Sequence, residues 1–101
     1  MDVDITIIGA GVVGLAIAAE VATHNREVFV VEKNRTFGQE TSARNSQVIH
    51  SGIYYPEYSL KGIMCVAGNH KLYDLCDRYG IGYRRTGKLI VATRNEDTLE
   101  L

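Results

Sequence analysis

The opening of the chain constrains its fold more than any other feature of the sequence. An apolar segment, 3–8, leads into a glycine-rich turn, 9–14. After an alanine-rich segment, a second strand-like segment, 27–31, is apolar at 28–31 and is followed by Glu32. This order of strand, glycine turn, helix, strand and acid is typical of a βαβ unit that binds a dinucleotide. The sequence therefore predicts an α/β fold with a Rossmann-type unit at its start.

The glycine-rich turn is the predicted binding site for phosphate groups. Gly9 is expected to permit the tight turn off the first strand, Gly11 to let the backbone approach a pyrophosphate, and Gly14 to let the helix pack close to the strand. The helix N-terminus adds free N–H groups and a partial positive charge, which favour an anion. The whole predicted turn consists of Gly9, Ala10, Gly11, Val12, Val13 and Gly14. The alternative is a βαβ unit whose glycines serve packing alone.

Glu32 is the predicted partner of a ribose. It follows Gly9 at about the 20-residue spacing expected of the acid that accepts hydrogen bonds from ribose hydroxyls. A carboxylate here disfavours NADP, because it would lie against the 2′-phosphate. The position of Glu32 does not separate NAD from FAD, since both carry an adenosine ribose with a free 2′-hydroxyl.

Length and charge limit the classes of protein to consider. The chain has 101 residues and a net charge of −1. This length allows one domain or a piece of one, and the charge gives no reason to expect nucleic acid as a partner. No stretch approaches the roughly 20 apolar residues of a spanning helix, and the acidic start lacks the basic region of a signal peptide. We therefore expect a cytoplasmic protein, or one peripheral to the inner membrane.

The second half of the chain predicts one helix and a hairpin. Residues 59–79 have apolar side chains at helical spacing, with Ser59 as N-cap and Gly80 after the end. Residues 82–85 and 88–92 are expected to form the two strands of a hairpin, and a further helix is expected to begin at Thr93.

The chain is expected to contain parts of two domains. Residues 1–80 would form the N-terminal part of a nucleotide-binding domain, and 81–101 would begin a substrate domain. The first two strands are apolar on nearly every residue, which is the pattern of parallel strands covered on both faces. Few further strands are present to protect the sheet edges. The sequence therefore predicts the start of a longer protein. A small self-contained nucleotide-binding module is the alternative.

A second motif follows Glu32. Residues 39–55 are dense in short hydroxyl and amide side chains around one arginine. Thr41 or Ser42 is expected to cap a short helix that begins there, which would create a second N-terminus suited to an anion. Arg44 would neutralise a phosphate. The alternative is an ordinary capped polar loop.

Together, the two motifs give the chain a resemblance to a known family. The segments that carry it are IIGAGVVGLAIA, VVEKN, TSARNSQVIHSGIYY, SLKG, LCDRYGI and TGKLIVAT. The chain resembles the N-terminal part of the FAD-dependent oxidoreductases of the D-amino-acid-oxidase type. Within them it is most similar to the L-2-hydroxyglutarate dehydrogenases/oxidases.

The resemblance implies FAD as the cofactor. Beyond the glycine turn, the residues implied to hold FAD are Glu32, Lys33, Thr41, Ser42, Arg44, Asn45, Ser46, Val48 and Ile49. Glu32 would take the adenosine ribose, residues 41–46 would line the pyrophosphate and ribityl chain, and residues 48–50 would run along the flavin ring. The chain lacks the later glycine motif and most of the substrate cap of this family.

The resemblance also implies a reaction. A 2-hydroxy acid, L-2-hydroxyglutarate, would be oxidised to 2-oxoglutarate by transfer of a hydride to flavin N5. His50 is the candidate base, because an imidazole accepts a proton near neutral pH. Packing against the flavin is its alternative role. The expected partners are this small-molecule substrate and an electron acceptor, oxygen or a quinone. The rival functions are a flavin amine oxidase acting on glycine, sarcosine or a D-amino acid, and a non-catalytic dinucleotide-binding module.

Overall fold

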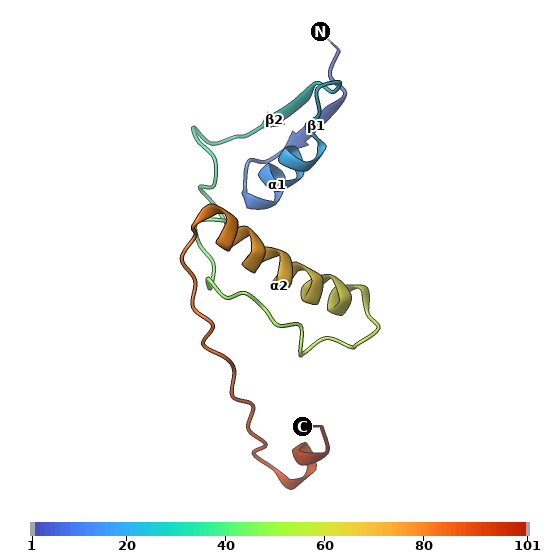
Figure 1. Cartoon of the computed structure of the whole chain (residues 1–101), viewed down its shortest axis with the longest axis vertical. Helices are drawn as coiled ribbons and strands as arrows, with labels where there is room; N and C mark the ends of the chain where they lie inside the picture. Colours follow the sequence, from blue (N-terminus) through green and yellow to red (C-terminus); the bar gives the residue numbers. More distant parts are fainter. Residues whose placement is uncertain (1, 101) are drawn as a thin grey trace. The chain divides into compact units, whose positions relative to one another are not determined.

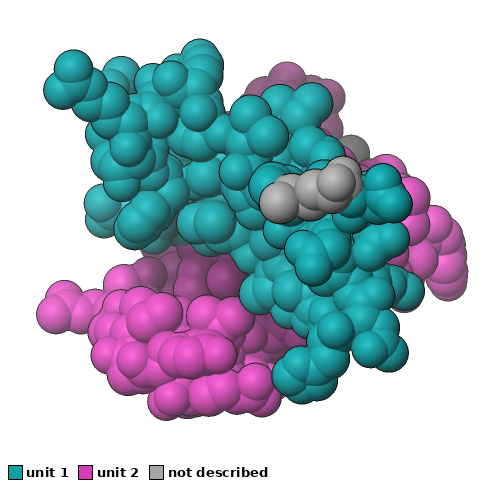
Figure 2. Space-filling view, turned by 90° about the horizontal axis from the view of Figure 1, so that it is seen from above, with its two compact units in different colours: residues 1–48 teal, residues 49–101 magenta. Residues whose placement is uncertain are grey.

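The computed structural model of the chain describes residues 2–100 and divides it into two compact units. Unit 1 comprises residues 1–48 and unit 2 residues 49–101. Figure 1 traces the elements along the chain, and Figure 2 colours unit 1 teal and unit 2 magenta. Each unit is described by itself below.

Unit 1 contains the predicted βαβ unit. Strand β1 (Ile5–Ile8) leads to helix α1 (Val12–Val21), and strand β2 (Val28–Val31) follows. The two strands pair in parallel, with Ile5 opposite Val28 and Ile8 opposite Val31. Parallel pairing requires a crossover connection, which α1 provides. The prediction of a Rossmann-type start is confirmed.

The two-stranded sheet leaves most of its apolar residues exposed. Within residues 2–48 the one buried hydrophobic residue is Ala10, which is 6% exposed, whereas Ile8, at the end of β1, is 90% exposed. All four residues of β2 are apolar, and Phe29, Val30 and Val31 are exposed. Runs of this kind belong to parallel strands that are covered on both faces. Within residues 2–48, most of that cover is absent.

Unit 2 is organised around helix α2 (Leu60–Tyr79). The Ser59 hydroxyl accepts a hydrogen bond from the Gly62 N–H at 3.0 Å, as expected of an N-cap. At the other end Gly80 has φ +66°, and its N–H donates to the Cys76 carbonyl. This left-handed conformation ends the helix, and glycine adopts it without steric cost. Both predicted helix boundaries are confirmed.

The predicted hairpin is wrong. The structure assigns no strand to 82–85 or 88–92, and no backbone hydrogen bond joins these two segments. A lone pair of strands is only marginally stable, because each needs a neighbour to satisfy its N–H and C=O groups. After this extended segment comes a short 3-10 helix, η1 (Asn95–Glu100), in place of the longer helix expected from Thr93.

Among residues 2–100, no helix combines the length and the apolar character needed to cross a bilayer.

Candidate dinucleotide-binding site

The glycine turn has the geometry that its sequence predicts. Gly9 has φ +102°, a conformation that L side chains rarely adopt, and its N–H donates to the Val31 carbonyl at 2.7 Å. A Cβ atom added at Gly14 would lie far inside contact distance of the Gly9 carbonyl and 3.4 Å from the Ile7 side chain. The close approach of α1 to β1 therefore depends on glycine at position 14.

Glu32 holds the glycine turn from the end of β2. One carboxylate oxygen, Oε2, accepts from the Ala10 N–H at 2.8 Å, and the other, Oε1, accepts from the Asn34 N–H at 2.9 Å. These two N–H groups lower the pKa of Glu32 below its usual value, and the larger contribution comes from the Asn34 N–H. Both oxygens retain further lone pairs for a ligand, because an ionised carboxylate offers about four acceptor sites.

Two further residues from downstream close around the turn. The Gly38 N–H donates to the Ala10 carbonyl at 2.9 Å. The Ser42 hydroxyl accepts from the Val12 N–H at 2.8 Å, and Gly11, which precedes the helix, makes no side-chain cap of its own. Ser42 therefore caps α1 from 30 residues away. Both backbone groups of Ala10 are bonded, which explains why this small residue is the buried one.

The N-terminus of α1 retains donors for an anion. Within residues 2–100, no hydrogen bond is found for the backbone N–H groups of Gly11, Val13 and Gly14, and the first helical bond runs from Leu15 to the Gly11 carbonyl. A helix N-terminus with such N–H groups favours a phosphate. No acidic side chain lies in the first turn to compete for them. The residues present thus fit the pyrophosphate of a dinucleotide.

The polar loop after Gly38 forms turns, so the predicted short helix at Thr41 or Ser42 is wrong. The Asn45 side-chain amide donates to the Thr41 and Ser42 carbonyls at 3.1 and 3.2 Å. The backbone bonds here run from the Ala43 N–H to the Glu40 carbonyl and from the Arg44 N–H to the Thr41 carbonyl, three residues back, whereas an α-helix bonds four residues back. Gln47 has φ +56°, which also lies outside the right-handed helical region.

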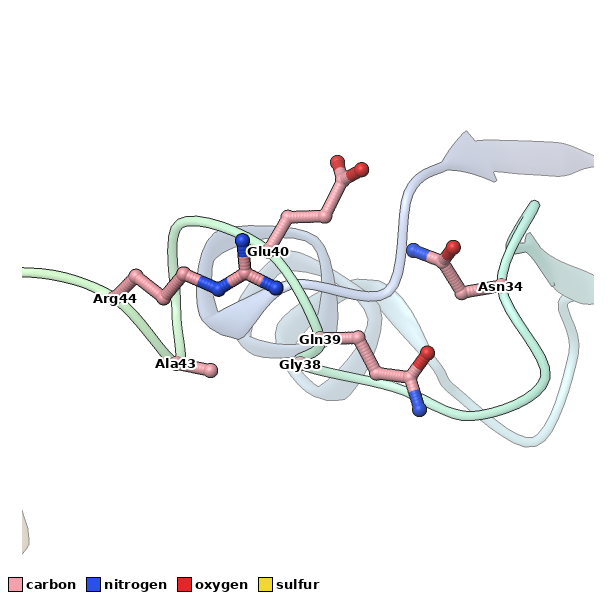
Figure 3. Close-up of a pocket in the computed structure, with 6 residues that line it drawn as sticks. All are labelled: Asn34, Gly38, Gln39, Glu40, Ala43 and Arg44. Atoms are coloured by element: carbon pink, nitrogen blue, oxygen red, sulfur yellow. The ribbon is translucent and has the colours of Figure 1, made fainter.

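A polar cavity of about 560 Å³ lies beside this loop in unit 1 (Figure 3). It is lined by Asn34, Gly38, Gln39, Glu40, Ala43 and Arg44. The Arg44 guanidinium and the Asn34 amide extend toward it from opposite sides. The Glu40 carboxylate is paired with the Lys33 ammonium at 2.7 Å, and this pairing raises the pKa of Lys33. Arg44 therefore carries the positive charge offered to a ligand here.

The remaining predicted residues are less constrained. Thr41, Ser46 and Val48 are exposed, and no side-chain hydrogen bond is found for Thr41 or Ser46 in the described part of the chain. Ile49, half-buried, and His50, exposed, belong to unit 2. The His50 carbonyl accepts from the Asn69 side-chain amide at 2.9 Å.

Sequence reasoning missed Asn34, Gly38 and Asn69. Asn34 and Gly38 act through backbone N–H groups, which any residue except proline supplies, so their side chains gave no signal. A glycine inside a polar stretch, as at Gly38 with φ +68°, was the one available hint of a turn.

Comparison with known proteins identifies the family to which the chain is similar. The sequence profile of the family described as "FAD dependent oxidoreductase" matches residues 4–101. The chain is 50% identical over 99 residues to a protein from Arabidopsis thaliana named "L-2-hydroxyglutarate dehydrogenase, mitochondrial", covering 98% of this chain and 20% of that protein. Proteins of the same name from Homo sapiens and Dictyostelium discoideum are 46% and 40% identical over 93% and 97% of this chain. The chain spans only about a fifth of the length of these relatives, 20% to 22%.

The comparison overturns one expectation. The relatives from Arabidopsis thaliana, Dictyostelium discoideum and Homo sapiens are all named as mitochondrial. The predicted cytoplasmic location is therefore wrong by this comparison. The reasoning failed because charge and the absence of an apolar stretch carry no information about the compartment.

Proposed function

Because the chain belongs to the FAD-dependent oxidoreductase family, we propose that the whole protein oxidises L-2-hydroxyglutarate to 2-oxoglutarate. The observation that carries the proposal is the 40% to 50% identity, over nearly the entire chain, to proteins named L-2-hydroxyglutarate dehydrogenase. This chain would supply the ADP-binding half of the FAD site, and residues 81–101 would begin the substrate domain.

The glycine turn would hold the pyrophosphate of FAD through the N–H groups at the start of α1. Glu32 would accept hydrogen bonds from the adenosine ribose, while Arg44 would lie near a phosphate. Bound FAD supplies a two-electron acceptor for the oxidation of a C–H bond. In this proposal the protein's own task in unit 1 is to bind and orient the cofactor.

His50 is the proposed base. Oxidation of a secondary alcohol to a ketone releases the hydroxyl proton, and an exposed imidazole is a group that can accept it. No hydrogen bond or ion pair to the His50 ring is found among residues 2–100, so the ring nitrogens remain available to a substrate. The electrons would pass on to oxygen or a quinone, and a quinone would bring the protein to a membrane surface.

The visible absorption spectrum of the full-length protein tests the proposal. The spectrum is recorded under anaerobic conditions before and after addition of L-2-hydroxyglutarate. We expect a flavin band that bleaches with this substrate and stays oxidised with its D enantiomer, which controls for a non-specific reductant.

Two other results would contradict the proposal in different ways. A flavin that bleaches with sarcosine, glycine or a D-amino acid, but stays oxidised with L-2-hydroxyglutarate, would indicate an amine oxidase. A protein that binds no flavin when FAD is supplied would leave a non-catalytic dinucleotide-binding module.

A further inference from the structure

The loop that carries His50 follows one face of α2, turn by turn. At its start the His50 carbonyl meets the Asn69 amide at 2.9 Å. In its middle, a Cβ atom added at Gly52 would lie 3.0 Å from Cγ2 of Val66. At its end, a Cβ atom added at Gly62 would lie 2.7 Å from the Pro56 carbonyl. The loop and the helix therefore run antiparallel, and they are seen side by side in Figure 1.

These contacts fix the backbone of the loop while leaving the imidazole free. Gly52 has φ +87°, and its carbonyl accepts from the Tyr55 N–H at 3.0 Å, which closes a turn where the chain passes Val66. The His50 carbonyl receives the Asn69 amide and, more weakly, the Cys65 thiol at 3.9 Å. These two donors lie one helical turn apart on α2, on the same face. The His50 side chain itself is exposed.

We propose that Asn69 is a positioning residue for His50: its side-chain amide holds the backbone from which the imidazole projects. This inference rests on the proposed function, in which His50 is the base. A base must lie within hydrogen-bond reach of the proton that it accepts, so a small displacement of its backbone slows the reaction. Asn69 does so from 19 residues away, through a hydrogen bond to the backbone carbonyl of His50.

Substitution of Asn69 by Asp isolates the hydrogen bond. The aspartate has the same shape, but its ionised carboxylate has no N–H to donate and would face the His50 carbonyl with like polarity. Asn69→Gln keeps an amide donor on a longer side chain and should recover part of the effect. Asn25→Asp is the matched control, because Asn25 is exposed and lies in unit 1.

The first readout is independent of turnover. In the full-length holoenzyme, amide hydrogen exchange at residues 50–53 should be about tenfold faster in Asn69→Asp and unchanged in Asn25→Asp. Equal exchange in the wild type and Asn69→Asp would overturn the inference, because it would show that the amide does not hold this loop.

The second readout separates positioning from general stability. In Asn69→Asp, kcat per bound flavin should fall about tenfold, with KM and flavin content within about twofold of the wild type. In a His50→Gln background the same change should alter kcat by less than about twofold, because the group it positions is already absent. A loss of flavin with kcat per flavin unchanged, or an equal loss of kcat in both backgrounds, would overturn the inference.

Failure of the proposed function gives a different pattern. If His50→Gln leaves kcat at the wild-type value, His50 is not the base and the positioning role falls with it. Faster exchange in Asn69→Asp would then show only a structural anchor. If His50→Gln lowers kcat but Asn69→Asp does not, the base is supported and the positioning inference alone is wrong.

Discussion

The glycine turn, 9–14, and the extended segment, 81–93, differ in where their hydrogen-bond partners come from. Three residues downstream in the same unit hold the turn by hydrogen bonds. Glu32 and Gly38 bond to the backbone of Ala10, and Ser42 bonds to the backbone of Val12. Residues 81–93 have no regular backbone pairing. The turn completes its local structure within 35 residues of chain, whereas an extended segment needs a neighbouring strand before its backbone groups are satisfied.

Side chains replace the missing backbone pairing at the start of the extended segment. The Tyr83 hydroxyl donates to the Asp77 carboxylate at 2.8 Å, and its ring meets that of Tyr73 edge to face at 4.9 Å. The Arg85 guanidinium lies 3.7 Å from the centre of the Tyr73 ring. These contacts attach the segment to α2 without giving it a strand. Side-chain contacts can thus hold a segment against a helix even where its backbone groups have no regular partners.

The largest effect is expected from Gly14→Ala, which attacks the glycine turn directly. The added methyl group would collide with the Gly9 carbonyl. The main chain of the turn cannot yield without breaking its bonds, so we expect a loss of about 2–3 kcal/mol of stability in the full-length protein. FAD content should fall with it. Thermal unfolding and the flavin-to-protein absorbance ratio measure both effects.

Gly68→Ala is the control for this change. Gly68 is also a helical glycine, but a Cβ atom there would meet nothing within 4 Å. Alanine is the better helix former by about 1 kcal/mol, so this variant should be more stable than the wild type. A similar destabilisation by both substitutions would show that the fit at Gly14 is not special.

The next largest effect is expected from Glu32→Gln, through its pH dependence. The pKa of Glu32 is lowered in the folded state by the Asn34 and Ala10 N–H groups. Its ionised form therefore stabilises the fold above the usual pKa of a glutamate, and this contribution is lost as the pH falls through the lowered pKa. The unfolding midpoint of the wild type should fall more steeply with acid than that of Glu32→Gln.

FAD affinity gives a second measure of the same substitution. Glutamine has one acceptor oxygen where the carboxylate has two, so we expect FAD to bind about tenfold more weakly to Glu32→Gln in fluorescence titrations. Glu27→Gln changes an exposed acid outside the turn and should leave the affinity unchanged. Identical acid profiles for the wild type and Glu32→Gln would show that Glu32 does not hold the turn.

A smaller effect is expected from Ser42→Ala, which removes the cap of α1. The Val12 N–H loses its acceptor, and loss of a helix cap costs about 1 kcal/mol. Ser42→Thr keeps the hydroxyl and should restore the stability. Ser46→Ala removes a hydroxyl for which no hydrogen bond is found within the described residues, and thus serves as the control. Chemical denaturation resolves differences of this size. Equal stability of Ser42→Ala and the wild type would contradict the capping role.

The predictions from sequence succeeded where the determining groups are neighbours in the chain. Ser59 and Gly80 marked both ends of α2, because a cap acts within one turn. The glycine spacing predicted the turn and its helix for the same reason. The hydrogen bond from the Val12 N–H to the Ser42 hydroxyl could not be predicted, because it joins residues 30 apart whose proximity depends on the path of a polar loop. The helix expected at Ser42 does not form: its hydroxyl accepts from the Val12 N–H, and the backbone bonds within residues 40–44 span three residues, not the four of an α-helix.

The smallest effect is expected at residues 88–92, which belong to the extended segment. It tests whether this segment lacks backbone hydrogen-bond partners within the chain. Their apolar, strand-like sequence predicted a strand, yet Leu89 is 88% exposed and no backbone hydrogen bond pairs the segment with a neighbouring strand. In the 101-residue chain, their amides should therefore exchange with solvent at rates near those of an unfolded peptide. In the full-length protein, a partner strand would slow the same amides. Protection already present in the 101-residue chain would show that residues 82–92 form the hairpin without a further partner strand. The contrast with the glycine turn would then be one of degree, because both regions would find their hydrogen-bond partners within this stretch of chain.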